Sequence, residues 1–339
     1  MNLKSLLIGS AAAVVITSGA QAADAVVYAE PEPMEYVRIC DVYGAGFFYI
    51  PGTETCLKIG GYFRFDVGFA ISEPSGYASL ARFAPNFDVR SETEWGTLRG
   101  YAELELDWAS SGGGTETNLL YGFIELTTAN GALRIGKGEN PYSRYLGFAG
   151  LNVIDTEFYP YLASNEISYT FTASNGFSAI IAVLDNPDDD SWGTNVEGGF
   201  QFSQGWGSVG LIAGYDGVYE TWGLQGAVVG NFGETFSAKI GAYYSDSLDG
   251  YYATPTPYGD VVDWSVYGSV SAQFSEKASA ALTVQWFNEG VFTNDTWMVQ
   301  GEVAYTPVEN FKIVPSIRYA TTDGADDIWA GVVRFQRDF

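Results

Sequence analysis

Histidine is absent from this 339-residue sequence, and only three methionines and two cysteines are present. Without histidine the chain cannot build a Ser-His-Asp triad, a histidine acid or base, or an HExxH zinc site, so these enzyme classes are excluded. Two cysteines and no histidine also argue against a metal site, and the sequence suggests no cofactor. Paired carboxylates remain, but acidic residues gather in runs such as Asp188-Asp189-Asp190, which we interpret as solvated loops. We therefore expect a protein that is not an enzyme.

Long hydrophobic runs are also missing. The most apolar stretch, residues 6–16, follows Lys4 and precedes Ala20-Gln21-Ala22, which is typical of an export signal cleaved before Ala23. The alternative, a membrane anchor, would need roughly twenty apolar residues. We expect residues 1–22 to be a signal peptide. Because only helices and closed barrels satisfy every backbone hydrogen bond in lipid, any membrane residence must then be as a barrel.

Basic residues are few, with 16 Lys and Arg against 41 Asp and Glu. The signal holds one basic residue and no acidic one, so the mature chain carries 15 basic side chains and a net charge of about −26. Such acidity argues against a nucleic-acid partner, which requires a basic surface. Aromatic residues make up 16% and glycines number 41, which favours an ordered, β-rich chain over disorder.

Alternation of apolar and polar residues is the main pattern that is present. In residues 263–274 every second residue is apolar or small (Trp264, Val266, Gly268, Val270, Ala272, Phe274) and the intervening ones are polar (Ser265, Tyr267, Ser269, Ser271, Gln273). A period of two predicts a strand with one apolar face. Sixteen such stretches are predicted, at residues 57–69, 79–90, 97–108, 117–127, 131–137, 164–173, 176–184, 195–203, 206–215, 220–230, 234–245, 263–274, 277–288, 294–305, 310–321 and 327–339.

The connections between these stretches alternate in length. Short turns such as Asn130-Gly131 and Asn175-Gly176 are tight-turn dipeptides, and longer loops follow in rotation. A soluble β-sandwich also alternates along its strands, but it needs no fixed order of long and short connections. The fold class expected is therefore all-β, a 16-stranded antiparallel transmembrane β-barrel.

Two cysteines, Cys40 and Cys56, lie close together near the start of an exported chain. We expect a disulfide between them, with two free thiols as the alternative. Residues 23–56 are predicted to form a periplasmic lead-in and this Cys-bounded segment, and residues 57–339 the barrel.

The third long connection, residues 138–163, is too long and too apolar to be a simple exposed hairpin. We expect it to fold into the lumen and narrow it; the alternative is an external flap.

Alternation also places an arc of basic residues on the inner wall, namely Lys58, Arg64, Arg82, Arg90, Arg99, Lys312, Arg318 and Arg334, extended by Arg134. We expect Arg64, Arg82, Arg134, Arg318 and Arg334 to face the carboxylates of Glu139, Asp155 and Glu157 from the third long loop and so to line a constriction. In the alternative, the arginines pair locally with Asp66, Asp88, Glu103 and Glu105.

Aromatic residues are predicted on both faces. Outward rings near strand ends suit the interface girdles of a barrel. A continuous ladder of inward rings would favour a sugar-specific pore, but the inward rings are scattered along the sequence (Tyr62, Tyr101, Tyr121, Phe123, Tyr243, Tyr267). Pro85 and Pro315 fall within predicted strands, where only local bulges would explain them.

The chain resembles the general porins of the alphaproteobacterial outer membrane. The resemblance rests on EYVRICDVYGAGFFYIPGTETCLKIGGYFRFDV at residues 35–67, NGFSA at 175–179 and WAGVVRFQRDF at 329–339. It implies a trimer of water-filled barrels with the third loop inside, surrounded by outer-membrane lipid and lipopolysaccharide. The terminal Phe339 is similar to the C-terminal aromatic recognised by the barrel-assembly machinery.

Together these observations predict a passive diffusion channel for small hydrophilic solutes and ions. The alternatives are a substrate-specific channel for sugars or anions, and a structural or adhesion barrel that does not conduct.

Overall fold

The computed structural model describes residues 37–72, 75–110, 114–154, 158–186, 193–291 and 294–339. Among these residues, no helix has the length and apolar character needed to cross a membrane.

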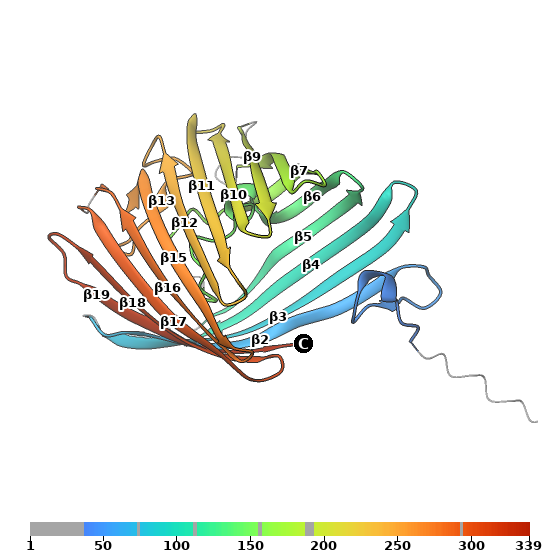
Figure 1. The fold of residues 1–339 in the computed structure, drawn as a ribbon, viewed down its shortest axis with the longest axis horizontal. Coiled ribbons are helices and arrows are strands. Elements are labelled where there is room, and N and C mark those ends of the chain that lie inside the picture. Colours follow the sequence, from blue (N-terminus) through green and yellow to red (C-terminus); the bar gives the residue numbers. More distant parts are fainter. Residues whose placement is uncertain (1–36, 73–74, 111–113, 155–157, 187–192, 292–293) are drawn as a thin grey trace, which may run out of the picture. The chain divides into compact units, whose positions relative to one another are not determined.

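Within the described residues, sixteen long strands form one antiparallel sheet that closes on itself (Figure 1). They are β2 (Cys56–Ala70), β3 (Gly76–Thr93), β4 (Gly96–Ala109), β5 (Thr115–Thr128), β6 (Gly131–Glu139), β7 (Ala163–Thr172), β8 (Phe177–Asp185), β9 (Thr194–Gln204), β10 (Gly207–Asp216), β11 (Thr221–Phe232), β12 (Phe236–Ser245), β15 (Trp264–Ser275), β16 (Ala278–Phe287), β17 (Thr296–Val308), β18 (Phe311–Thr322) and β19 (Ile328–Asp338). Each strand pairs with the strand before it and the strand after it in this order. The last strand, β19, pairs with the first, β2, and so closes the barrel, with Phe335 opposite Phe65. The sixteen predicted strands are confirmed, every end within three residues.

Short and long connections alternate around the barrel, as predicted. The short ones include the two-residue turns between β3 and β4 and between β5 and β6. The second of these turns requires glycine, because Gly131 has φ of 156° and a Cβ there would lie 2.1 Å from the carbonyl oxygen of Thr170. The long connections all lie at the opposite end of the barrel, which is the exterior end in this architecture.

The two prolines are accommodated without a bulge at their own positions. Pro85 lies opposite Gly61 of β2, and Pro315 lies opposite Val333 of β19, both in unbroken register. On their other sides the paired positions are interrupted: with β4 they resume in the same register, and with β17 they resume at Tyr305 before the register shifts between Tyr305 and Val308. Each proline therefore interrupts the ladder on one side only; the expectation of a bulge is wrong at Pro85, whereas a register shift does lie close to Pro315.

An N-terminal segment, residues 37–55, precedes the barrel and contains η1 (Asp41–Tyr43) and β1 (Phe48–Tyr49). The disulfide between Cys40 and Cys56 is confirmed, with the two Cα atoms 6.1 Å apart. β19 ends opposite Tyr62, so the first residues of β2 extend beyond it, and β1 pairs with β2 at Leu57 and Cys56. The segment thus covers part of an edge that would otherwise be open.

Candidate functional site: the lumen and its inward loops

The connection between β6 and β7, residues 140–162, is the third long connection, and we call it loop 3. It opens with the short helix α1 (Pro141–Arg144). The backbone N–H of Tyr142 donates to the carboxylate of Glu197 on β9 at 2.7 Å, and Glu197 is completely buried. Arg144 pairs with Glu166 on β7 at 2.6 Å. Two wall carboxylates therefore fix the start of loop 3, one of them at the helix N-terminus, where negative charge is favoured.

The middle of loop 3 is held by wall residues on the far side of the lumen. Lys239 on β12 donates to the carbonyl oxygen of Leu146 at 3.0 Å and to that of Phe148. The Glu302 carboxylate on β17 accepts the backbone N–H groups of Val153 and Ile154, the latter at 3.1 Å. Four polar side chains of the wall also hydrogen-bond to loop 3: Ser269 on β15, Thr283 and Gln285 on β16, and Gln300 on β17. Loop 3 therefore runs inside the barrel, as predicted.

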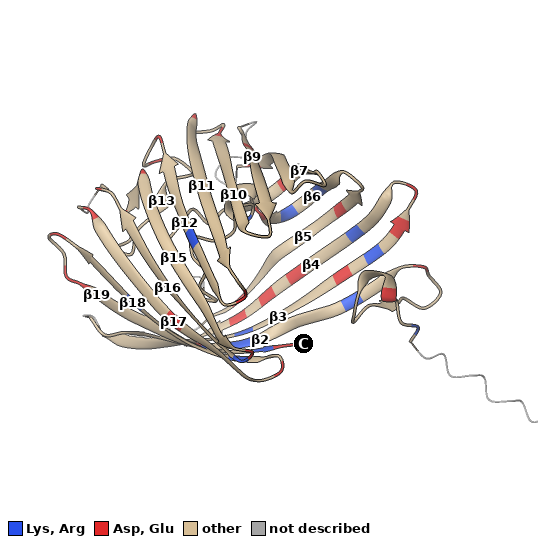
Figure 2. Cartoon of the chain, viewed as in Figure 1, with Lys and Arg blue, Asp and Glu red and all other residues tan. Residues whose placement is uncertain are grey.

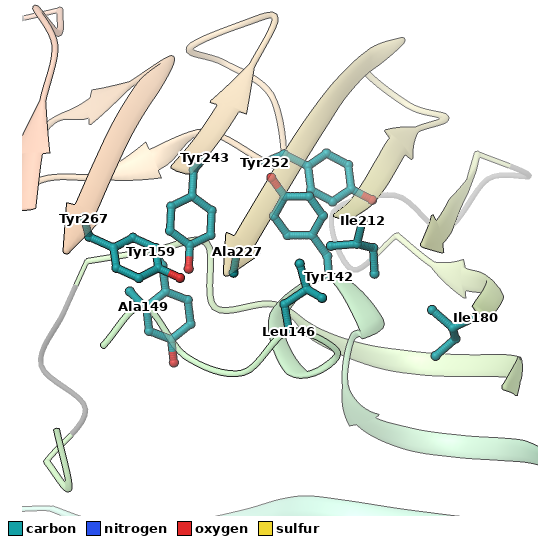
Figure 3. Packing of buried hydrophobic residues seen from close by; sticks show 10 residues of the cluster. All are labelled: Tyr142, Leu146, Ala149, Tyr159, Ile180, Ile212, Ala227, Tyr243, Tyr252 and Tyr267. Atoms are coloured by element: carbon teal, nitrogen blue, oxygen red, sulfur yellow. The ribbon is translucent and has the colours of Figure 1, made fainter. Parts of the chain in front are cut away.

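Apolar packing supports the same path. Loop 3 residues interdigitate with inward rings and aliphatic side chains of the wall (Figure 3), in a buried cluster of Tyr142, Leu146, Ala149, Tyr159, Ile180, Ile212, Ala227, Tyr243, Tyr252 and Tyr267. Because these side chains are almost fully enclosed, this face of loop 3 is a small hydrophobic core built within the lumen.

A second external connection, residues 246–263, also folds inward. It carries the small hairpin of β13 (Thr254–Pro255) and β14 (Val261–Val262). Tyr252 from this connection fills the space above Gly214 and Gly223, where a Cβ would lie 2.2 and 2.3 Å from its atoms. Its hydroxyl donates to Glu197 at 3.2 Å, and its ring lies 4.7 Å from that of Tyr142. Burial raises the pKa of Tyr252, so it stays a neutral donor that braces the start of loop 3.

The opposite wall carries most of the charge. Figure 2 shows blue and red bands along β2 to β6, whereas β15 to β17 are nearly free of them. Six basic and six acidic residues form ion pairs here, all between neighbouring strands except that of Arg90 with Asp88, which lies within β3: Arg82 with Glu105 and Asp107, Arg90 and Arg99 with Asp88, Arg99 and Arg134 with Glu125, Lys312 with Asp338, and Arg334 with Asp66. We call β18, β19 and β2–β6 the charged wall, and the inner face of β7–β12 and β15–β17, which carries few charges, the neutral wall. In the described part of the chain, loop 3 bonds chiefly to the neutral wall and meets the charged wall at its edges, where Tyr161 bonds Glu139 of β6 and Phe158 lies against Arg318 of β18. The rest of the charged wall faces loop 3 across the lumen.

Comparison with known proteins agrees with this architecture. The sequence matches the family described as the porin subfamily over residues 24–334. This chain belongs to that family. Porin Omp2b of Brucella canis and that of Brucella abortus are each 38% identical to it over the full length of both chains. This porin is therefore an outer-membrane diffusion channel with a multi-pass β-barrel.

Solved structures share the fold at low sequence identity. The outer membrane channel DcaP of Acinetobacter baumannii superposes with a TM-score of 0.67 at 10% identity, covering 86% of this chain and 99% of that one. An anion-selective porin from Comamonas acidovorans gives 0.62 at 14% identity, covering 84% of this chain and all of the other. These similarities concern the barrel and not the chemistry of its lumen.

The arginines expected at the constriction lie in different surroundings. Arg82 and Arg134 bond carboxylates on adjacent strands, and Arg334 bonds Asp66 with two hydrogen bonds of 2.9 and 2.8 Å. Arg64 donates to the amide oxygen of Gln336 at 2.9 Å. The guanidinium of Arg318 lies 4.9 Å from the ring centre of Phe158 in loop 3.

The loop acids are placed only in part. Glu139 ends β6, is buried, and accepts the hydroxyl of Tyr161 at 3.2 Å. Asp155 and Glu157 lie outside the described residues. In the part of the chain that the structure describes, the ion pairs of Arg82, Arg134 and Arg334 are with carboxylates of neighbouring strands, which is the alternative that the sequence left open.

Phe339 lies where the last strand meets the first. Its backbone N–H donates to the carbonyl oxygen of Gly61 at 3.0 Å. Its ring centre is 5.6 Å from that of Phe63 and 6.2 Å from that of Phe83, and the side chain is exposed on the outer face. The terminal ring thus joins an aromatic group at the closure of the barrel.

Sequence reasoning missed the residues that hold loop 3, namely Glu166, Glu197, Lys239 and Glu302. Each is an isolated charge on a strand whose other inward residues are uncharged. A lone charge on an otherwise neutral inner face needs a partner, and this signal pointed to a loop packed against those strands.

Proposed function

We propose that small hydrophilic solutes and ions pass between loop 3 and the charged wall, and that this gap is the constriction of a passive, non-enzymatic pore. One observation carries the proposal: loop 3 is bonded chiefly to strands from β7 to β17, so it covers the neutral wall and leaves most of the charged wall uncovered. Arg64, Arg82, Arg134, Arg318 and Arg334 would line the passage, with Glu139 from the end of β6 and Asp155 and Glu157 from loop 3.

We further propose a weak preference for cations. The ion pairs of the charged wall balance six positive against six negative charges, so the wall has little net field. The net charge of about −26 on the mature chain then biases the mouth towards cations. Because screening acts over about 10 Å at 0.1 M salt, the preference should fall as salt rises.

Removal of the central part of loop 3 tests the proposed path. A variant lacking residues 143–154 should conduct more current per channel and admit larger solutes, because a narrow section dominates the resistance of a wide pore. Single-channel recording in planar bilayers measures this, and heat-dependent gel mobility confirms that the variant has folded. Unchanged conductance in a folded variant would place the constriction elsewhere.

Family membership supports a proposal about assembly and partners. We infer that residues 1–22 are removed on export, that residues 23–56 lie in the periplasm, and that residues 57–339 span the membrane as one subunit of a homotrimer. Outer-membrane lipid and lipopolysaccharide would contact the apolar outer face, and the barrel-assembly machinery would recognise Phe339.

A further inference from the structure

Three inward rings of the charged wall form one aromatic group. Tyr101 on β4 lies opposite Phe123 on β5, and their ring centres are 5.4 Å apart. Tyr121, two residues along β5, lies 6.1 Å from Tyr101 and 6.4 Å from Phe123. β6 makes room for Tyr121 with Gly138, because a Cβ there would lie 3.1 Å from the Tyr121 ring. These rings are dispersed in the sequence, but strand pairing brings them together.

Loop 3 extends this group across the lumen. Tyr161 donates to Glu139, which also interacts with the hydroxyl of Tyr121. The ring of Tyr159 lies 6.3 Å from that of Tyr161 and 5.9 Å from that of Phe148. Tyr161 is 47% exposed and Phe148 is 41% exposed. Since the other face of loop 3 packs on the wall, both exposed rings face the water of the lumen.

Polar groups of both kinds border the rings. The guanidinium of Arg99 lies 4.7 Å from the centre of Tyr101, and that of Arg134 lies 4.0 Å from the centre of Phe123. On the other side are the carboxylates of Glu103, which accepts the Tyr101 hydroxyl, and Glu139. The rings therefore lie between hydrogen-bond donors and acceptors, and the arginines are already neutralised by Asp88 and Glu125.

We propose that this surface is a binding subsite for neutral sugars. A pyranose ring has an apolar face that packs on an aromatic ring, and its edge carries hydroxyls that both donate and accept hydrogen bonds. Tyr101, Tyr121 and Tyr161 supply the aromatic surface, Glu139 positions the hydroxyls of Tyr121 and Tyr161, Glu103 accepts from sugar hydroxyls, and Arg99 and Arg134 donate. A mixture of both charges with exposed rings selects a neutral polyhydroxylated ligand over an ion of either sign.

This inference rests on the proposed path between loop 3 and the charged wall, since a sugar must pass there to meet these rings. The subsite would slow a passing sugar and bind it weakly, and the channel would still conduct ions in its absence.

Sugar-induced interruptions of the ionic current test the subsite. Maltotriose is added to single channels of the full-length protein, with a polyethylene glycol of similar mass as the control for size. Maltotriose should interrupt the current with a saturable concentration dependence, and the polymer should not. Tyr121→Ala and Tyr161→Ala should each weaken the apparent affinity by about threefold to tenfold, the effect expected for loss of one aromatic contact. Tyr169→Ala serves as the matched control, because Tyr169 is exposed on the outer face of β7.

The outcomes separate the subsite from the pore. Channels that conduct but show no maltotriose block, or that are blocked equally by the polymer, would overturn the subsite and leave the proposed path intact. Equal sugar affinity in the parent and in both inward variants would overturn it as well, even if conductance changed. Absence of conductance would instead contradict the channel itself.

Discussion

Glu302 holds the middle of loop 3, and its replacement by glutamine should loosen the constriction. The carboxylate is 5% exposed and accepts two backbone N–H groups, from Val153 and Ile154. A glutamine amide has nearly the same shape, but it offers one acceptor oxygen and turns an NH2 group towards the second N–H. One hydrogen bond to a charged acceptor is therefore lost, and the remaining one becomes neutral.

The expected magnitude follows from this geometry. A hydrogen bond to a charged group contributes about 1.5–3 kcal/mol, and about 1.4 kcal/mol corresponds to a factor of ten in population. The detached state of this segment of loop 3 should thus become about tenfold to a hundredfold more populated in Glu302→Gln. The fold should persist, because the sixteen-strand ladder does not involve this side chain.

Two measurements report on the detachment. Open-channel current noise in planar bilayers should increase, and the backbone amides of residues 153 and 154 should exchange hydrogen faster by a similar factor. Glu103→Gln is the control, because it removes the same inward charge from a residue that bonds Tyr101 and not the loop. If the Glu302 variant shows parental noise and parental exchange, or if the Glu103 variant is equally noisy, the anchoring role is refuted.

Further predictions concern charge, the N-terminal segment and assembly. Arg334→Ala leaves Asp66 without its ion pair and should shift reversal potentials in a salt gradient towards cations, whereas Arg337→Ala, on the other face of β19, should not. Replacement of both disulfide cysteines by serine should remove about 3 kcal/mol of chain-entropy stabilisation for a loop of this length, seen as faster hydrogen exchange in residues 41–55 with an unchanged barrel. Burial raises the pKa of Tyr43 to about 12, so its contribution to docking of that segment should be present below pH 10 and lost between pH 10 and 12; a tyrosinate titration compared with Tyr43→Phe measures this. Deletion of Phe339 should reduce the yield of heat-resistant barrel in the outer membrane, and an unchanged yield would contradict its role in assembly.

The barrel was predictable because its rules are local. Alternation identifies each strand, and Gly131 or Asn175-Gly176 identifies the turns, since each feature depends on a few adjacent residues. Pro85 was misjudged for the same reason. The sequence predicted a local bulge there, but the glycine opposite it on β2 and two unpaired positions with β4 accommodate it without one. That compensation lies on other strands.

The lumen was harder to predict, because its groups come from strands far apart in the sequence. The basic arc was derived correctly as a set of residues on neighbouring strands, but its partners depended on cross-strand register: Arg334 lies opposite Asp66 only because β19 closes on β2. Tyr101 and Phe123 were judged scattered since they are 22 positions apart in the sequence, whereas register places them side by side.

The division of the lumen into a neutral wall and a charged wall explains where loop 3 packs. Its backbone N–H and C=O groups need partners once they leave water, and an ion-paired arginine or aspartate would have to break its own pair to supply one. The serine, threonine and glutamine side chains of β15 to β17 bond the loop at no such cost, and Glu302 and Lys239 are single charges that bind backbone groups directly. Placing loop 3 on the charged wall would therefore leave both the loop and these isolated charges without partners. It follows that a pair of charges added to β16 should weaken loop attachment more than the same pair added to β4.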